Sequence, residues 1–575
     1  MNKLQQIGCM VAMVLMPLMA RAQDSSPVKV DFESKVIYAD SLALPQNLNV
    51  GALIRLLPEL LQRPGDRTLS NYEVQVDGVG VGGSADAILS VMQLADIEKL
   101  EVKNSPTSTD LNGGMSGSIN LVLKPMGSKR KGTSGKVALG VSTESSLMTD
   151  VLMDYHGKKL TVRGMLFGEA YSAQKSTEVL QYGVPDTKAT NNFWNQMARA
   201  MITYTPNERN KLDLTLTEGM NLDKHKIDDL TSMDENIQDV KTYSFINFER
   251  KSMLNARLNY NYQISRAQKL KLSAQYSHTP IHNWTDNEQG VTEYEYKSYE
   301  NVAEASAELS GQWKIGEKGL WSYKVGTKGM LAKSNKQLMP LAELTLLYGP
   351  LRIKAGYEYQ WNKEGRSDWT GRMVIGYQLS PGNRVRVLMN RQLNRSRMTS
   401  QEIGAEYITH HVWGKHQLTA NVGVNSCKSL VIDDNDSNYK SANLMAVYQY
   451  DIFFLSLTAN IFSHGQDAYE ENANAKGKDY TYFNFSVMPS LNLKNGWRTA
   501  LNLRYYSKVK TNVDEQGNCV SLQMNVGKSW GHWMVYAYGR LSLTGRVTYY
   551  NNIVDVTTLT PLVPTSAGCG ASWSF

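Results

Sequence analysis

The sequence predicts a mainly β protein, a 22-stranded transmembrane β-barrel that follows a small N-terminal α+β domain. Three observations support this fold class. From about residue 132 to residue 575, apolar and polar residues alternate with a period of two. The connections between the alternating segments are short and long in alternation. The segment that precedes residue 127 lacks this alternation and combines helical with strand patterns.

The composition suits a protein that crosses a membrane with strands. The chain has 575 residues, of which 31 are Tyr and 44 are Gly, and 42% are hydrophobic. A barrel meets lipid with every second residue only, so its mean hydropathy resembles that of a soluble protein. The net charge of +7 is spread along the chain without a basic patch. This distribution argues against nucleic acid as a partner.

The first 22 residues have the pattern of a secretory signal peptide. Lys3 precedes an apolar run over 7–20, and Ala20-Arg21-Ala22 has the form of a cleavage site. No later segment reaches the roughly 20 apolar residues that a spanning helix needs. We therefore expect an exported protein of the bacterial outer membrane. Its expected parts are a signal peptide (1–22), an N-terminal domain (23–126) and a barrel (132–575).

The alternation divides the barrel into 22 segments, each about long enough to cross a bilayer as a tilted strand. In 383–391, every second residue is apolar, and Arg and Asn stand between them. An even number of strands is what a closed single-chain bacterial barrel requires. The segments begin near residues 134, 147, 159, 193, 211, 252, 268, 301, 320, 339, 351, 369, 383, 402, 416, 441, 452, 480, 496, 518, 532 and 566.

The joins between these segments alternate in length. One set consists of tight turns such as His156-Gly157-Lys158, Gly349-Pro350 and Gly414-Lys415. Short periplasmic turns and long external loops are typical of outer-membrane barrels, so we expect the N-terminal domain and both termini on the periplasmic side. The other set is predicted as loops over 172–191, 223–249, 281–299, 464–479 and 547–565.

The N-terminal domain has a different rhythm. Helical periodicity predicts helices over 52–61 and 87–93. Alternation predicts strands over 72–76, 97–102 and 118–124. The pair Asp77-Gly78, which follows the first of these strands, is typical of a tight turn.

Three motifs in this domain resemble the plug of TonB-dependent receptors of the outer membrane. Val76-Asp77-Gly78-Val79 is similar to the "VDGV" strand and turn, and 96–102 to the "DIERIEV" strand. The segment 113–122 is similar to the closing "G-x-x-x-G-x-INIV" stretch. Lys103-Asn104-Ser105-Pro106 departs from the family's Arg-Gly-Pro and keeps the proline. The residues that match the plug pattern are Asp77, Gly78, Asp96, Glu98, Glu101, Pro106, Gly113, Gly114, Gly117 and Asn120.

The resemblance implies a plugged transporter that takes up an external ligand with energy delivered by TonB. Such a protein needs no enzymatic activity, no cofactor and no metal. A TonB box should precede the plug, and the candidate is Pro27, Val28, Lys29 and Val30. The last strand ends on Trp573 and Phe575, which resembles the signal that the barrel assembly machinery reads. The implied partners are therefore outer-membrane lipid, TonB, this machinery and a ligand that the sequence does not identify.

A second hypothesis from another class is a non-transporting outer-membrane barrel with a structural, assembly or surface-binding role. The altered loop at 103–106 and the weak box at 26–30 favour it. A passive porin is disfavoured, because the plug-like domain should fill the lumen.

A few lumen-facing residues allow more than one interpretation. Arg384, Arg386 and Arg504 lie on the inward phase, where they could steer an anionic ligand, bind the plug or line a polar wall. Cys427 and Cys519 share this phase, and isolated thiols are favoured over a disulfide between them.

Overall fold

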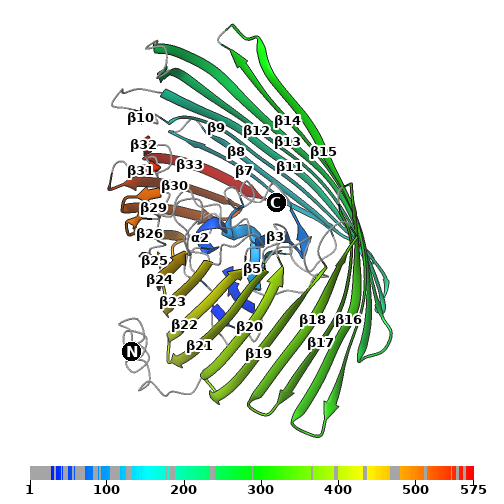
Figure 1. Cartoon of the computed structure of the whole chain (residues 1–575). Helices are drawn as coiled ribbons and strands as arrows, with labels where there is room; N and C mark the ends of the chain where they lie inside the picture. Colours follow the sequence, from blue (N-terminus) through cyan, green and yellow to red (C-terminus); the bar gives the residue numbers. More distant parts are fainter. Residues whose placement is uncertain are drawn as a thin grey trace.

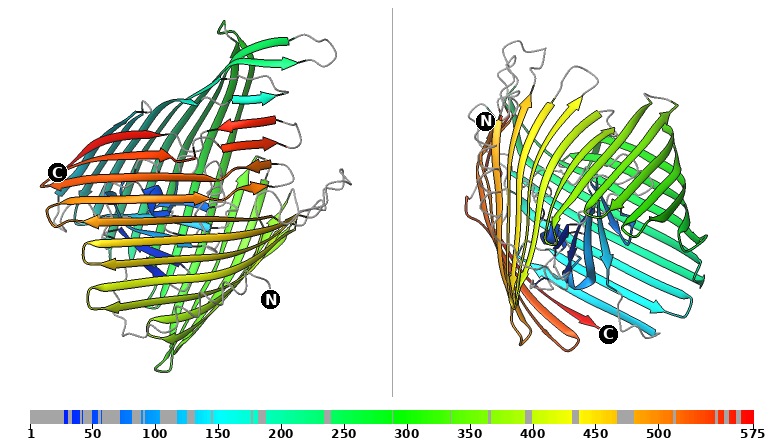
Figure 2. Two further views of the ribbon diagram at one scale, coloured as in Figure 1. Left: turned by 90° about the vertical axis from the view of Figure 1, so that its left-hand side faces the viewer. Right: turned by 90° about the horizontal axis from the view of Figure 1, so that it is seen from below.

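The chain forms a closed barrel with a small N-terminal domain, the plug, inside it (Figures 1 and 2). The computed structural model describes the strands of the plug and of the barrel. The residues that it describes are 28–30, 34–39, 42, 50–54, 57, 72–81, 89, 92–103, 117–124, 132–143, 146–175, 178–181, 188–233, 240–287, 289–333, 335–363, 367–393, 399–430, 437–466, 480–510, 514–544, 547–551, 556–560 and 565–575.

The barrel has 22 antiparallel strands, which confirms the predicted number. The last strand pairs with the first, Gly568 opposite Ser142, so the sheet has no free edge. Its strands are β7 (Gly132–Ser142), β8 (Leu147–His156), β9 (Leu160–Lys175), β11 (Lys188–Asn207), β12 (Asn210–Met233), β13 (Val240–Gln263), β14 (Gln268–Asn287), β15 (Thr292–Ile315), β16 (Gly319–Ala332), β17 (Asn335–Tyr348), β18 (Leu351–Asn362), β19 (Asp368–Ser380), β20 (Asn383–Leu393), β21 (Thr399–Trp413), β22 (His416–Leu430), β23 (Ser437–Tyr450), β24 (Phe453–Gln466), β25 (Tyr480–Asn492), β26 (Trp497–Tyr506), β29 (Cys519–Trp530), β30 (Trp533–Ser542) and β33 (Ser566–Ser574).

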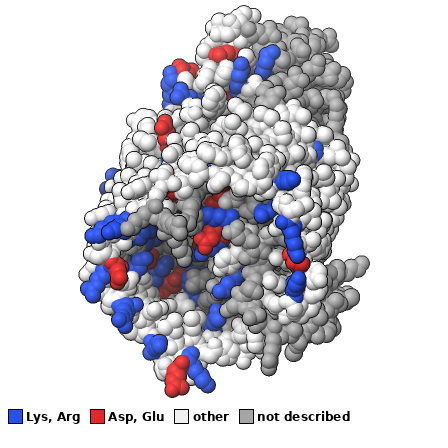
Figure 3. Space-filling model, turned by 180° about the vertical axis from the view of Figure 1, so that it is seen from behind, with Lys and Arg blue, Asp and Glu red and all other residues white. Residues whose placement is uncertain are grey.

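The outer face of the barrel is suited to lipid. Leu272 and Tyr276 of β14 point outward and are exposed, whereas Ser273 between them faces the lumen. The space-filling view shows broad areas of the surface without charge (Figure 3). Aromatic side chains near the short turns form the belt expected at a membrane interface. Its exposed members are Tyr155, Tyr204, Trp313, Trp321, Tyr348, Tyr377, Trp413, Tyr450, Trp497, Trp530, Trp533, Trp573 and Phe575.

The predicted loops over 223–249 and 281–299 mostly continue the barrel strands, so those predictions were wrong. β12 and β13 pair through Lys224 and Phe248 up to Met233 and Val240. β14 and β15 likewise continue to Asn287 and Thr292. Beyond the lipid both faces of a strand meet water, so the apolar alternation that identifies strands is lost there. Segments of other loops form a second sheet in the order β10 (Glu178–Gln181), β32 (Val556–Thr560), β31 (Val547–Asn551), β28 (Asp514–Gln516), β27 (Val509–Lys510).

The plug contains one mixed sheet of six strands. β3 and β6 are parallel, and the other neighbours are antiparallel. Its core side chains, such as Ile37, Leu100, Ile119 and Leu121, are fully buried. The strand order is β1 (Val28–Val30), β2 (Ser34–Tyr38), β5 (Ile97–Lys103), β6 (Gly117–Leu123), β3 (Tyr72–Val76), β4 (Val79–Gly80).

The predicted plug helices differ from the observed ones. Helix α2 spans Val50–Ile54, so it begins before the predicted 52–61 segment and has ended at Leu57. Pro58 explains the end, because proline disfavours helical geometry in the residue before it. The segment predicted as a helix over 87–93 is not helical at its end. Gln93 is extended, with φ −96° and ψ 159°, and precedes the 3₁₀ turn η5 (Leu94–Asp96).

Some predictions fall outside the described residues. These include the signal peptide (1–22), Pro27, Pro106, Gly113, Gly114 and the link between plug and barrel at 125–131. The domain bounds 23–126 and 132–575 therefore stay predictions. In the part of the chain that is described, no helix is both long and apolar enough to cross a membrane. Cys427 and Cys519 are both buried, and they do not form a disulfide with each other.

Candidate functional site: the contacts that hold the plug

The turn between β3 and β4 is held both by the plug sheet and by the barrel wall. Asp77 and Gly78 have φ values of 50° and 77°, the left-handed geometry of a two-residue hairpin turn. The Gly78 amide donates to Asn120 Oδ1 at 2.8 Å, and Asp77 Oδ1 accepts the Leu123 amide at 3.0 Å. These bonds fix the turn to β6, and they leave the second carboxylate oxygen of Asp77 facing the barrel wall.

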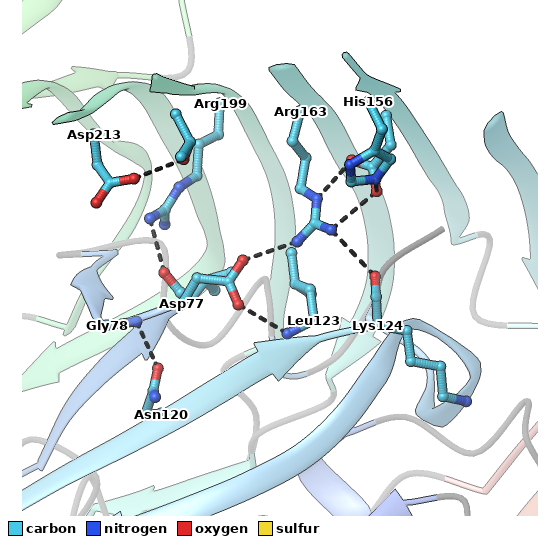
Figure 4. Close-up of polar contacts among 12 residues, drawn as sticks. Asp77, Gly78, Asn120, Leu123, Lys124, His156, Arg163, Arg199 and Asp213 are labelled. Atoms are coloured by element: carbon cyan, nitrogen blue, oxygen red, sulfur yellow. Dashed lines mark hydrogen bonds and ion pairs between the residues drawn. The ribbon is translucent and has the colours of Figure 1, made fainter. Parts of the chain in front are cut away.

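Arg163 of β9 holds this carboxylate (Figure 4). Its Nη1 donates to Asp77 Oδ2 at 2.9 Å, and its Nη2 donates to the Lys124 carbonyl at 3.2 Å. The same guanidinium makes two bonds to Asp154 of β8, at 2.6 and 2.9 Å. Asp154 therefore orients Arg163 from the barrel side, as a bidentate carboxylate pair does well. We call the Asp77, Arg163 and Asp154 group the Asp77 clamp.

Two further arginines support the turn. Arg199 of β11 donates to the Val76 carbonyl at 2.9 Å, and Arg257 of β13 reaches the Gly78 carbonyl at 3.5 Å. Both side chains are buried. Three cations thus converge on one plug turn, where they contact one plug carboxylate and three plug carbonyls.

A second clamp joins Asp96 of the plug to the first barrel strand. Lys136 Nζ lies 2.5 Å from Asp96 Oδ1 and 2.8 Å from Asp150 Oδ2. All three side chains are almost completely buried. The other oxygen of Asp96 accepts the Gln93 amide at 2.9 Å, which closes the η5 turn. A buried cation between two carboxylates is stable only when both partners stay in place.

A third contact involves β2 of the plug. Lys35 Nζ lies 3.9 Å from Glu406 of β21, and Arg386 of β20 binds the same carboxylate at 2.5 Å. Asn421 donates to it at 3.3 Å. The sequence left three roles for Arg386: to steer an anionic ligand, to bind the plug or to line a polar wall. The geometry favours the last, because Arg386 binds the Glu406 carboxylate that faces Lys35 of the plug.

Burial is the largest single influence on the pKa of Asp77 and of Glu101, but it determines the direction of the shift only at Asp77. Burial raises the pKa of Asp77 above its ordinary value, although Arg163 and the Leu123 amide act in the opposite direction. Burial also acts to raise the pKa of Glu101. Hydrogen bonds from Lys99, at 2.6 Å, and Asn120, at 3.2 Å, outweigh it and leave that pKa lowered.

The remaining plug-motif residues have structural positions. Gly117 lies against the ring of Tyr72, and a Cβ atom there would come within 2.3 Å of that ring. Glu98 is exposed on β5. The motif residues Asp77, Gly78, Glu101 and Asn120 are brought together by the β3–β4 turn, β5 and β6. Asp96 is held separately by Lys136.

The candidate box is part of the plug sheet. Val28, Lys29 and Val30 form β1 and pair with Ile37, Val36 and Lys35 of β2. Val28 is only 1% exposed, whereas Lys29 is exposed. β1 is the edge strand of this sheet, so one of its edges is engaged by β2 and the other is not paired with a strand of the described sheet.

The last residues close the barrel. The Phe575 amide donates to the Gly135 carbonyl at 2.9 Å, and the Gly135 amide donates back at 3.0 Å. The ring of Phe575 covers Gly135 and stacks on Trp573 at 5.0 Å. Trp573 in turn lies 6.4 Å from Trp533. The terminal aromatic residues therefore join the first and last strands at the membrane interface.

Sequence reasoning missed the barrel side of the clamps. Lys136, Asp154, Arg163, Arg199 and Glu406 all stand on the inward phase of predicted strands. A charge on that phase was a usable signal, but the partner of each charge depends on how the plug docks. Among the described residues, no three His, Cys, Asp or Glu side chains are grouped to hold a metal ion.

Comparison with known proteins identifies the fold. No family model matches the sequence, and no curated protein matches it either. A mutant of the ferric enterobactin receptor PfeA from Pseudomonas aeruginosa has a TM-score of 0.67 at 10% identity, over 94% of this chain and 98% of that one. The open form of the ferric-catecholate import receptor Fiu from E. coli K12 has a TM-score of 0.65 at 10% identity, over 95% of this chain and 97% of that one. The siderophore receptor PirA from Pseudomonas aeruginosa has a TM-score of 0.64 at 10% identity, over 95% of this chain and 100% of that one.

The class follows from these likenesses and from the geometry. The chain has the fold of the TonB-dependent receptors, a closed 22-strand barrel around an N-terminal plug. This confirms the resemblance seen in the plug motifs as a likeness of fold. A closed barrel of this kind, with an apolar outer band, belongs to the bacterial outer membrane.

Proposed function

We propose that this chain is a TonB-dependent receptor that imports an external ligand, and that the ligand is a ferric siderophore of the catecholate type. The observation that supports transport is a plug that lies inside the barrel, where separate polar contacts join it to the wall. The ligand class rests on the similar structures, whose names give ferric enterobactin and ferric catecholate.

The mechanism uses binding and movement, and no bond is made or broken in the ligand. External loops and the top of the plug capture the ligand. TonB pairs with residues 27–30 on the periplasmic side and withdraws β1 from β2. Because β2 also carries Lys35, tension on β1 reaches the Glu406 contact directly. The Asp77 clamp, at the opposite edge of the sheet, then determines how far the plug opens.

A growth experiment tests this proposal. A strain that lacks the chain is grown under iron limitation with ferric enterobactin as the iron source. It is complemented either with the full chain or with a chain that lacks residues 26–30. We expect growth with the full chain and none with the deletion, although both proteins reach the outer membrane. Equal growth with the two chains would contradict TonB coupling through this segment.

A non-transporting barrel is the second candidate, and one observation favours it. Val28 is buried against the plug sheet, so its side chain is not accessible to a partner in this state. Under this hypothesis, neither chain alters growth on any iron source. Cells that lack the protein would instead show a defect in the envelope or in surface binding.

A further inference from the structure

Four neighbouring short turns of the barrel carry an arc of exposed cations. These turns follow one another round the wall, because β8, β9 and β11 to β16 are consecutive strands of the closed sheet. Neighbouring turns are therefore about 10 Å apart, which is twice the spacing of adjacent strands. The exposed cations are Lys158 and Lys159 in the β8–β9 turn, Arg209 in the β11–β12 turn, Arg266 in the β13–β14 turn and Lys318 in the β15–β16 turn. We call these five residues the basic arc.

The basic arc keeps an excess of positive charge. In the described part of the chain, none of its five side chains forms an ion pair. Lys211, which follows the β11–β12 turn, is not counted in the arc because it lies 3.1 Å from Asp213. Two exposed carboxylates, Glu208 and Glu317, stand in the same turns. Five cations less these two carboxylates leave a net charge of +3 along the arc.

The basic arc lies at the border of the lipid-facing surface. Each of its turns adjoins an exposed apolar side chain of the outer face, within three residues of a cation: Leu160, Leu212, Ile264 and Ile315. Lysine and arginine can lay their apolar stems along such a surface while the charged end reaches the polar side. Lys528 shows this elsewhere at the short-turn end, where its Nζ lies 5.1 Å from the ring centroid of Trp497 in the aromatic belt. The charges of the arc therefore stand at the depth of lipid headgroups.

The opposite end of these strands carries charges of both signs. Its exposed side chains include the cations Arg250, Lys251 and Lys297 and the carboxylates Asp223, Glu249 and Glu295. Glu295 and Lys297 pair with each other at 2.5 Å. Figure 3 shows the same difference, with both signs at the upper end of the molecule and mostly Lys and Arg along its lower edge. A surface that carries an excess of one sign attracts counter-ions, so an anionic partner is expected at the short-turn end.

We propose that the basic arc binds the phosphate groups of anionic phospholipids at the membrane surface that the short turns face. Each Lys or Arg beside an anionic membrane surface adds to the attraction. Arg209 and Arg266 can also hold a phosphate through two parallel hydrogen bonds. Position favours a lipid over a free phosphate, because acyl chains would cover Leu160 and Ile264 while the headgroup meets the arc. The proposal concerns the barrel and its membrane, and it does not depend on transport or on TonB.

Lipid competition on the purified full chain tests this proposal. The protein is held in detergent with equal amounts of phosphatidylglycerol, which is anionic, and phosphatidylethanolamine, which is zwitterionic. After washing, the lipids that stay bound are measured by mass spectrometry. The arc variant changes all five residues to glutamine (Lys158→Gln, Lys159→Gln, Arg209→Gln, Arg266→Gln, Lys318→Gln). The matched control removes five exposed cations from the opposite end (Arg250→Gln, Lys251→Gln, Lys297→Gln, Lys333→Gln, Lys336→Gln).

We expect the wild-type protein and the control variant to retain several-fold more phosphatidylglycerol than phosphatidylethanolamine. The arc variant should retain the two lipids about equally. A second measurement needs no variant. Because the arc is exposed and salt screens such charges over about 8 Å at physiological ionic strength, the wild-type preference should fall several-fold when salt is raised tenfold.

Three results would overturn the proposal. The first is a wild-type protein without a preference for phosphatidylglycerol, and the second is an equal loss of preference in the two variants. The third comes from sedimentation with purified peptidoglycan, another polyanion. If the arc variant keeps its lipid preference but no longer sediments with peptidoglycan, the arc belongs to that polymer and not to lipid.

Discussion

Arg163 offers the sharpest test of how the plug is held. The substitution Arg163→Met keeps the unbranched, mainly apolar stem of the side chain and removes the guanidinium. When the plug is in place, two of the four bonds of Arg163 go to the plug, one to Asp77 and one to the Lys124 carbonyl. Hydrogen bonds to charged groups contribute about 1.5–3 kcal/mol each, although neighbouring bonds are not additive. We therefore expect plug docking to weaken by about 2–4 kcal/mol, or roughly 30- to 900-fold in the opening equilibrium.

Hydrogen exchange of the purified protein measures this change. Peptides from 72–81 and 117–124 report the plug, because the Gly78 and Leu123 amides are bonded there. We expect faster exchange of these peptides in Arg163→Met. Arg209→Met, at an exposed β11–β12 turn, should leave it unchanged. Unchanged plug exchange in Arg163→Met would refute the role given to this clamp.

Asp154 needs a control of its own, because Arg163→Met leaves it buried without its cation. Uncompensated buried charges destabilise by about 3–5 kcal/mol, so part of the effect could arise in the barrel. The double variant Arg163→Met with Asp154→Asn removes both barrel charges. If the plug effect persists in this variant while exchange in the barrel returns to normal, it belongs to the contact with Asp77.

Three other predictions follow from the described contacts. Gly117→Ala should lower the unfolding free energy of the plug by about 1–3 kcal/mol, because its Cβ would overlap the Tyr72 ring. The loss measured by denaturant titration should shrink in a Tyr72→Ala background. Leu272→Arg, on the lipid face, should destabilise the folded barrel in lipid by about 2–4 kcal/mol, whereas Ser273→Arg, on the lumen face, should cost less. Equal effects would contradict the assigned faces. Because burial raises the pKa of Asp77, protonation of this carboxyl favours the folded plug. This pH-dependent contribution is complete below the ordinary pKa of 3.8 and is lost as the pH rises through the raised native pKa. Asp77→Asn should therefore flatten the pH dependence of plug stability over that window, and an unaltered profile would count against this assignment.

The barrel could be predicted from sequence because lipid imposes a simple rule. One face of each strand must be apolar, and β14 shows this rule from Leu270 to Tyr276. The rule stops where the lipid stops, so the outer parts of β12 to β15 were predicted as loops. The end of α2 was not predicted, because the helical spacing of leucines continues on both sides of Pro58 and was given more weight than the proline.

The sequence predicted the plug side of the site and not its barrel side. Asp77, Gly78 and Asn120 were identified from the plug motifs, and they do meet in the turn of β3. Their partners Arg163 and Arg199 lie 86 and more residues away along the chain. An inward charge on a barrel strand signals a polar lumen, but it does not say which plug atom it faces. That information comes from the docking of the two domains, which no local pattern encodes.

The central claim, that TonB acts on this plug through the segment around Lys29, can be tested without knowing the ligand. Lys29 is exposed on β1 and can be replaced by a photo-crosslinking amino acid in living cells. Receptors in the same cells that are known to engage TonB provide the positive control. The account predicts a crosslink between position 29 and TonB, and its loss when Val28 and Val30 are changed to glycine. No TonB adduct at position 29, in cells where the control receptors are captured, would contradict it.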